Sequence, residues 1–106
     1  MIFPDMVEIQ QKIDAPCIDS VENEVIAQLG GLDLAGRITA GDRIAVTAGS
    51  RGIHQIDRII RQVADTLKSH GAKPFIVPAM GSHGNGTAEG QEKILESLNI
   101  TEQTMG

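Results

Sequence analysis

The order of apolar and polar residues predicts a strand and then a helix in the first third of the chain. Within residues 6–13, Val7, Ile9 and Ile13 alternate with polar side chains, which is typical of a strand with one face on the core. A helix is predicted to begin at Asp19 or Ser20, to bury one apolar stripe and to end at the glycine pair 30–31. Glycine there is expected to adopt the left-handed conformation of a helix C-cap.

The middle of the chain predicts a β-α-β unit. Residues 43–49 and 73–80 are short apolar segments of the kind that form buried parallel strands. Between them, apolar residues recur at helical spacing over 53–67, and Gly71 is expected to end that helix. Strand, helix and strand in this order predict two parallel strands joined by a crossover helix.

A loop follows each strand of this unit. The first is Ser50-Arg51-Gly52, and the second contains Gly81-Ser82-His83-Gly84 and leads into a helix whose expected N-cap is Thr87. In open α/β sheets, ligands bind beyond the carboxyl ends of the strands. We therefore expect the two loops to face one another across a single two-loop site.

The predicted fold class is α/β, a three-layer Rossmann-like domain with a small, mainly parallel sheet. With 106 residues and no internal repeat, residues 1–106 are expected to form one domain. Residues 101–106 have the pattern of a helix start, and only three strands are predicted. Because so small a sheet usually needs further strands or a partner at its edges, we expect this domain to be the N-terminal part of a longer two-domain protein.

Composition and charge exclude several classes of partner. A net charge of −5 and only two aromatic residues argue against nucleic acid binding. The single cysteine, Cys17, excludes an internal disulfide and a cysteine-based zinc site. No apolar run approaches the roughly 20 residues of a membrane span. We expect a soluble cytoplasmic protein that has no membrane partner, and the pattern leaves its oligomeric state open.

His83 is the first candidate for chemistry. Imidazole, with an ordinary pKa of about 6.5, can take or give a proton at neutral pH, and three nearby glycines indicate a loop shaped around a ligand. The alternative is a surface histidine in a flexible turn. Arg51 precedes a helix N-terminus, where a guanidinium and backbone N–H groups can together hold a carboxylate or phosphate. The alternative for Arg51 is a bond to a neighbouring carbonyl or carboxylate.

Other catalytic templates are absent from the sequence. His54 and His70 are interpreted as structural, and with His83 they lack the paired spacing of a zinc site, so no metal ligand is expected in this chain. The glycine-rich loop is neither a P-loop nor a nucleophile elbow, and neither strand is followed by a GxGxxG fingerprint.

Three motifs resemble the N-terminal domain of nickel-dependent lactate racemase-like proteins. They are Ala48-Gly49-Ser50-Arg51-Gly52-Ile53, Pro74-Phe75-Ile76-Val77-Pro78-Ala79-Met80-Gly81-Ser82-His83-Gly84 and Thr87-Ala88-Glu89-Gly90-Gln91. The similarity covers residues 43–106 well and residues 6–42 loosely. It implies racemisation or epimerisation of a 2-hydroxy acid by hydride and proton transfer in an interdomain cleft. It also implies a nickel-pincer nucleotide in the full-length protein and a C-terminal domain as partner, while this chain alone is expected to be inactive and to bind no cofactor.

The resemblance also assigns roles to residues of the two loops. His83 matches the family's first proton-transferring histidine, and Arg51 matches an arginine that contacts the cofactor or substrate region. The remaining expected substrate- or cofactor-binding residues are Ser50, Gly81, Ser82 and Gly84.

The two loops also depart from the motifs of true lactate racemases. Those enzymes carry an Asp-His-Thr-Arg-Pro type of first loop and an arginine after the histidine, whereas this chain has no aspartate there and has Gly84. The pocket is therefore not expected to be tuned for lactate, and a larger or differently charged 2-hydroxy acid stays open as its substrate. A non-catalytic anion- or nucleotide-binding module and a purely structural domain remain alternatives.

Overall fold

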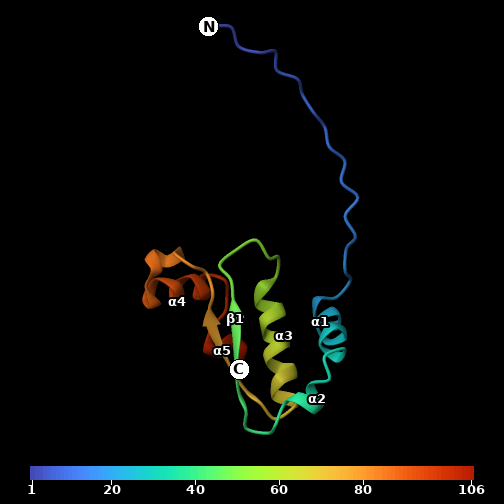
Figure 1. Cartoon of the computed structure of the whole chain (residues 1–106), viewed down its shortest axis with the longest axis vertical. Coiled ribbons are helices and arrows are strands. Elements are labelled where there is room, and N and C mark those ends of the chain that lie inside the picture. The colour runs from blue at the N-terminus through green and yellow to red at the C-terminus, as the bar shows by residue number, and fades with distance from the viewer.

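The computed structural model describes all 106 residues and contains helices, one 3₁₀ turn and a pair of strands (Figure 1). The elements in chain order are α1 (Val21–Gly30), α2 (Leu34–Arg37), β1 (Arg43–Ala48), α3 (Ile56–Ser69), β2 (Lys73–Pro78), η1 (His83–Gly86), α4 (Ala88–Ser97) and α5 (Glu102–Met105).

The sheet consists of β1 and β2, which run parallel as predicted. Their register places Arg43 opposite Lys73 and Ala48 opposite Pro78. The crossover between them is α3, the longest helix, which contacts both strands. The chain is therefore a mixed helix and strand fold with a small two-stranded parallel sheet, consistent with the α/β class.

One face of this sheet forms the core. Val46, Ala48 and Ile76 pack there with side chains from α3, from α4 and from the C-terminal residues, chiefly Ile56, Ile60, Leu95, Ile100 and Met105. On the opposite face, Ala45, Thr47 and Phe75 are exposed. The guanidinium of Arg43 lies over the ring of Phe75, with 5.1 Å between the guanidinium carbon and the ring centroid.

Three predicted helix ends are confirmed. The Ser20 side chain accepts a hydrogen bond from the Asn23 backbone N–H at 3.2 Å and caps α1. Thr87 caps α4 in the same way, accepting from Gly90 N–H at 3.1 Å. At the end of α3, Gly71 has a φ of 84°, the left-handed conformation that glycine adopts without strain.

One helix boundary and one helix cap differ from the prediction. The crossover helix begins at Ile56 rather than at residue 53, because Gln55 has a φ of 56° and cannot belong to a right-handed helix. The first helix does end at Gly30, but Gly31 has a φ of −77°, so the expected left-handed C-cap is wrong. The chain then enters the short helix α2, which the pattern did not predict, through Asp33, whose φ of 49° is left-handed.

The predicted strand over residues 6–13 is wrong. The N-terminal segment (residues 1–19) contains no strand or helix, and all its side chains are exposed. It extends away from the rest of the chain (Figure 1), which raises the radius of gyration to 19.0 Å, against about 13 Å for a compact chain of this size. Alternation indicates how side chains would divide between two faces, whereas a strand also needs a partner for its backbone N–H and C=O groups, and here there is none.

None of the helices combines the length and apolar character that crossing a membrane would require.

Candidate functional site

The two predicted loops meet beyond the ends of β1 and β2, as expected. The Oγ atom of Ser50 is hydrogen-bonded to Nδ1 of His83, and Nη2 of Arg51 lies 3.3 Å from Nε2 of the same ring. Parallel pairing causes this meeting, since both strands end at one edge of the sheet. The pairing continues one residue beyond β2, where Ala79 N–H donates to the carbonyl of Ala48 at 2.8 Å.

These contacts determine which imidazole nitrogen of a neutral His83 carries the proton. A guanidinium only donates hydrogen bonds, so Nε2 must be the acceptor in its contact with Arg51. The proton then lies on Nδ1 and is donated to Ser50 Oγ. His83 is therefore held as the Nδ1–H tautomer, with the lone pair of Nε2 directed toward Arg51 and the Ser50 hydroxyl free to donate to another group.

The loop that carries His83 depends on its glycines. Gly81, Gly84 and Gly86 have φ values of 59°, 64° and 64°, which side-chain-bearing residues rarely adopt. Gly84 also lies directly against Gly90 in the first turn of α4, and a Cβ placed on Gly90 would come within 1.9 Å of the Gly84 carbonyl oxygen. The loop and the start of α4 are therefore packed backbone to backbone.

Gln91 holds this loop from α4, a role that the sequence did not reveal. Its side-chain amide donates to the carbonyl of Gly81 at 2.8 Å and to that of His83 at 3.3 Å. The sequence pattern placed Gln91 in the predicted helix after Thr87 and gave it no role. Its position one turn after the Thr87 cap, beside a glycine-rich loop, was the available signal.

The other predicted residues have different surroundings. Ser50, His83 and Gly84 are half-buried, whereas Arg51, Gly81 and Ser82 are exposed, so solutes in water can reach the guanidinium. The Ser82 side chain makes no capping bond, and its carbonyl accepts from Gly86 N–H at 3.1 Å.

The remaining histidines lie outside the two-loop site. His54 is exposed, and His70 Nδ1 lies 2.9 Å from the Thr66 carbonyl at the end of α3. No group of three or more His, Cys, Asp or Glu side chains is arranged to hold a metal ion.

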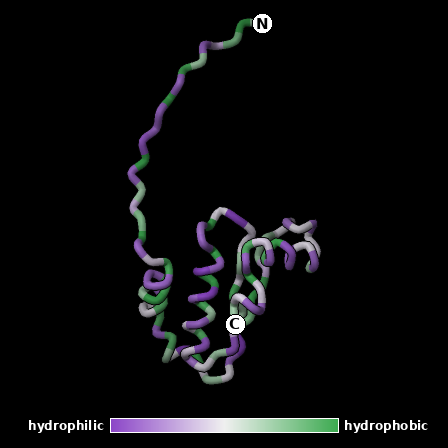
Figure 2. Tube along the Cα trace, turned by 180° about the vertical axis from the view of Figure 1, so that it is seen from behind, coloured by the Kyte–Doolittle hydropathy of each residue, from purple (hydrophilic) through white to green (hydrophobic).

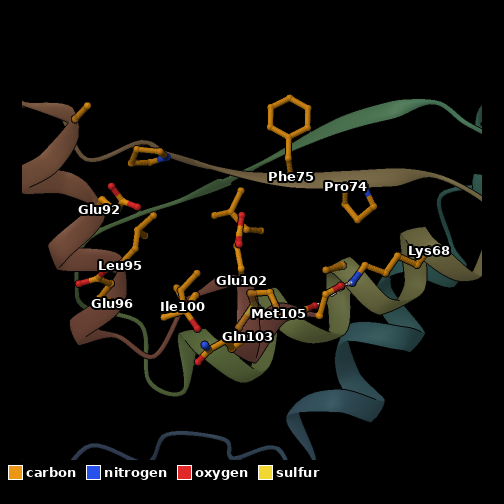
Figure 3. Close-up of a pocket in the computed structure, with 16 residues that line it drawn as sticks. Lys68, Pro74, Phe75, Glu92, Leu95, Glu96, Ile100, Glu102, Gln103 and Met105 are labelled. Carbon is orange, nitrogen blue, oxygen red and sulfur yellow. Dashed lines mark hydrogen bonds between the residues drawn. The ribbon is translucent and has the colours of Figure 1, made fainter.

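A groove of about 1160 Å³ lies between β2, α3, α4 and α5, and none of Ser50, Arg51 and His83 lines it (Figure 3). Its lining is largely apolar, with three carboxylates, from Glu92, Glu96 and Glu102, and one lysine, Lys68. An excess of negative charge disfavours an anionic ligand. A site for an anion is therefore better placed at Arg51 than in this groove.

Comparisons with protein-family models, curated proteins and solved structures found no match to this chain. The chain's own motifs and geometry therefore carry the functional argument. Of these, the meeting of Ser50, Arg51 and His83 at one edge of the sheet bears most directly on chemistry.

Proposed function

We propose that this chain is the N-terminal part of a lactate racemase-like protein, in which it binds a 2-hydroxy acid and transfers its hydroxyl proton. The observation that supports this most is the 3.3 Å separation of Arg51 Nη2 and His83 Nε2. A 2-hydroxy acid carries a carboxylate and a hydroxyl on adjacent carbons. An anion-binding group directly beside a proton acceptor suits that arrangement.

The residues of this chain would act in a definite order. A substrate carboxylate is a stronger partner for the Arg51 guanidinium than a neutral imidazole is, because both hydrogen-bonding groups are then charged. Binding would draw Arg51 away from Nε2 and free that lone pair. His83, held by Ser50, would then accept the hydroxyl proton as a general base and return it when the alcohol is formed again.

The cofactor implied by the resemblance would be held only in part by this chain. The donor set does not fit a metal, since the histidines are dispersed and no group of ligands converges. The backbone N–H groups of the glycine loop suit an anionic portion of a nucleotide. When bound, a nickel-pincer nucleotide would supply acceptance of the α-hydrogen as hydride, and its metal ligands would belong to the C-terminal domain.

The proposal extends to the fold of the complete domain. A three-layer Rossmann-like domain has helices on both faces of its sheet. Here one face carries exposed Ala45, Thr47 and Phe75, and the Phe75 side chain is 41% exposed. An aromatic ring on an open sheet face supports a further layer at this position in the longer protein.

The departures from the family motifs define the substrate further. Without the loop aspartate and the arginine that follows the histidine, the site lacks two groups that true lactate racemases have. Gly84 in place of that arginine removes a bulky side chain beside His83. The proposed substrate is a 2-hydroxy acid that is larger than lactate or differently charged.

The binding part of this proposal can be tested on the chain itself by NMR titration. 2-Hydroxybutyrate, malate and mandelate are each compared with the matching acid that lacks the hydroxyl: butyrate, succinate and phenylacetate. We expect one hydroxy acid to shift the amide resonances of Ser50, Arg51 and His83 more strongly than its matching acid. Arg51→Ala should abolish the response, and Arg37→Ala, a change of an exposed arginine on α2, should preserve it. Equal responses to both acids of every pair would contradict the proposal.

A further inference from the structure

We propose that residues 6–13 of one copy of this chain add as a strand to the free edge of β1 in a second copy, so that two chains exchange their N-terminal segments reciprocally. This inference does not depend on the proposed function.

The donor is the N-terminal segment. Hydrophobic and hydrophilic residues follow one another along it (Figure 2), and Met6, Val7, Ile9 and Ile13 are between 74% and 94% exposed. So many large apolar side chains exposed on one short segment mark an interaction site. Its period of two fits a strand that buries one face.

The hydrogen bonds within the sheet show which strand edge can receive the segment. The carbonyls of Asp42 and Ala48 accept from β2 and its continuation, so even-numbered residues of β1 direct their backbone groups toward β2. In a strand, successive residues direct these groups to opposite sides. The N–H and C=O groups of Arg43, Ala45 and Thr47 therefore point to the free edge, and none of these residues is proline.

The free edge of β2 is a poor acceptor by the same criterion. Lys73 and Ala79 donate to the β1 side, which leaves Pro74, Ile76 and Pro78 facing outward. Two of these three residues have no N–H group to donate. Proline on an edge strand is a known means of preventing strand addition. Of the two edges, only that of β1 presents an unbroken row of donors and acceptors.

The position of α1 supports the same edge. This helix packs beside α3, and Arg58 of α3 donates two hydrogen bonds to Glu22 of α1, at 2.7 and 2.6 Å. Right-handed crossovers that proceed in one direction along a sheet place successive helices on the same face. A strand that precedes α1 in the chain is therefore expected next to β1 and parallel to it.

The linker between residues 6–13 and α1 indicates that the added strand comes from a second copy of the chain. Pro16 lies between residues 6–13 and α1, and proline together with the residue before it favours extended backbone. The segment accordingly runs away from its own body and leaves its own β1 edge unpaired (Figure 1). Exchange of an identical element between protomers is a common route to a symmetric dimer.

Charge suggests the register. Arg43 and Lys73 are neighbours across β1 and β2, an unfavourable pair of like charges, whereas the N-terminal segment carries four carboxylates and one lysine. Placing Glu8 beside Arg43 brings Gln10 beside Ala45 and Lys12 beside Thr47. Glu8, Gln10 and Lys12 then share the exposed sheet face, and Val7, Ile9 and Ile13 turn toward the helices, with Gln11 the one polar residue among them.

Cysteine pairing tests the arrangement in the full chain. In a Cys17→Ser background, a chain carrying Gln10→Cys is mixed with one carrying Ala45→Cys and oxidised with oxidised glutathione. Adjacent strands lie about 4.8 Å apart, within the range that a disulfide can span. We expect a covalent heterodimer, and little of it when Ile2→Cys replaces Gln10→Cys.

A single chain that carries both cysteines separates the two sources of the strand. Exchange between copies gives a covalent dimer after oxidation, whereas a covalent monomer closed by an internal disulfide would overturn the proposal, as would the absence of any disulfide.

Without cysteine substitutions, light scattering should detect a dimer. Ile9→Pro should raise the dissociation constant of the dimer by about tenfold or more, because the backbone N–H of residue 9 can no longer donate to β1 of the other copy. The matched Ile2→Pro should leave the dissociation constant unchanged. A monomer at every concentration would also overturn the proposal.

Discussion

Ser50 and His83 are separated by 33 positions in the sequence, yet the serine hydroxyl is hydrogen-bonded to Nδ1 of the imidazole. The bond joins the loop after β1 to the loop after β2. Because Arg51 lies at the other ring nitrogen, both nitrogens of His83 have partners from the first loop. Ser50 therefore acts as a positioning residue for His83 in this account.

The tautomer of His83 is the first prediction. Nitrogen-15 NMR of the chain at a pH where the ring is neutral should find the proton on Nδ1, because Ser50 accepts there and Arg51 can only donate at Nε2. Ser50→Ala should shift the ring toward a mixture of tautomers, and Ser50→Thr should restore the wild-type spectrum. His54 and His70 provide internal controls that should not change. A proton on Nε2 in the wild type would contradict the assignment.

The close contact of Gly84 and Gly90 gives the second prediction. Gly90→Ala should destabilise the chain by about 1–3 kcal/mol, as overpacking does, because the new methyl group meets the Gly84 carbonyl backbone. Gly30→Ala is the matched control, since nothing lies within 4 Å of its added Cβ. That control should be neutral or slightly stabilising. Urea denaturation of both variants measures the difference in stability. Equal denaturation midpoints for Gly90→Ala and Gly30→Ala would contradict the prediction.

The pair of Glu22 and Arg58 predicts a pH dependence of stability. The Arg58 guanidinium, by its hydrogen bonds, lowers the pKa of the Glu22 carboxyl below its ordinary value. A lowered folded-state pKa contributes stability above the unfolded pKa of about 4.3, and the contribution is lost as pH falls through the lower folded value. In thermal melts at pH 7, the wild type should have a higher melting temperature than Glu22→Gln, and this difference should shrink as the pH is lowered. A difference independent of pH would contradict this.

Arg51 should act mainly through binding. In the complete polypeptide, Arg51→Ala should raise KM for the 2-hydroxy acid, because a charge-assisted contact with the carboxylate is lost. It should also lower kcat if that contact strengthens in the transition state. Steady-state kinetics separates the two effects, with Arg37→Ala as the control for loss of one positive charge. An unchanged KM would remove Arg51 from the proposed binding role.

The sequence predicted those parts of the fold that depend on local chemistry. Ser20 and Thr87 are N-caps because a side-chain oxygen satisfies a free N–H group within the same turn. The meeting of the two loops followed from parallel pairing alone. These features need no knowledge of distant contacts beyond the order of strand, helix and strand.

The failures concern partners and backbone angles that a pattern does not contain. Residues 6–13 alternate correctly for a strand, but nothing in the segment states which edge would pair with it. Gln55 has a left-handed φ, which propensity does not favour and which shortens α3. Gln91 reaches the His83 loop only because Gly84 and Gly90 bring the loop and α4 into contact.

The central claim is that His83 is the general base for a 2-hydroxy acid bound by Arg51. The most direct measurement is the rate at which the complete polypeptide interconverts the stereoisomers of the hydroxy acid that the chain prefers, for wild type and His83→Ala. Positioned proton transfer contributes about 10²–10⁴-fold, so the variant should be slower by that factor. Its melting behaviour should change little, by about 0.5 kcal/mol, as for surface substitutions. A variant that keeps the wild-type rate would contradict the account and favour an anion-binding module.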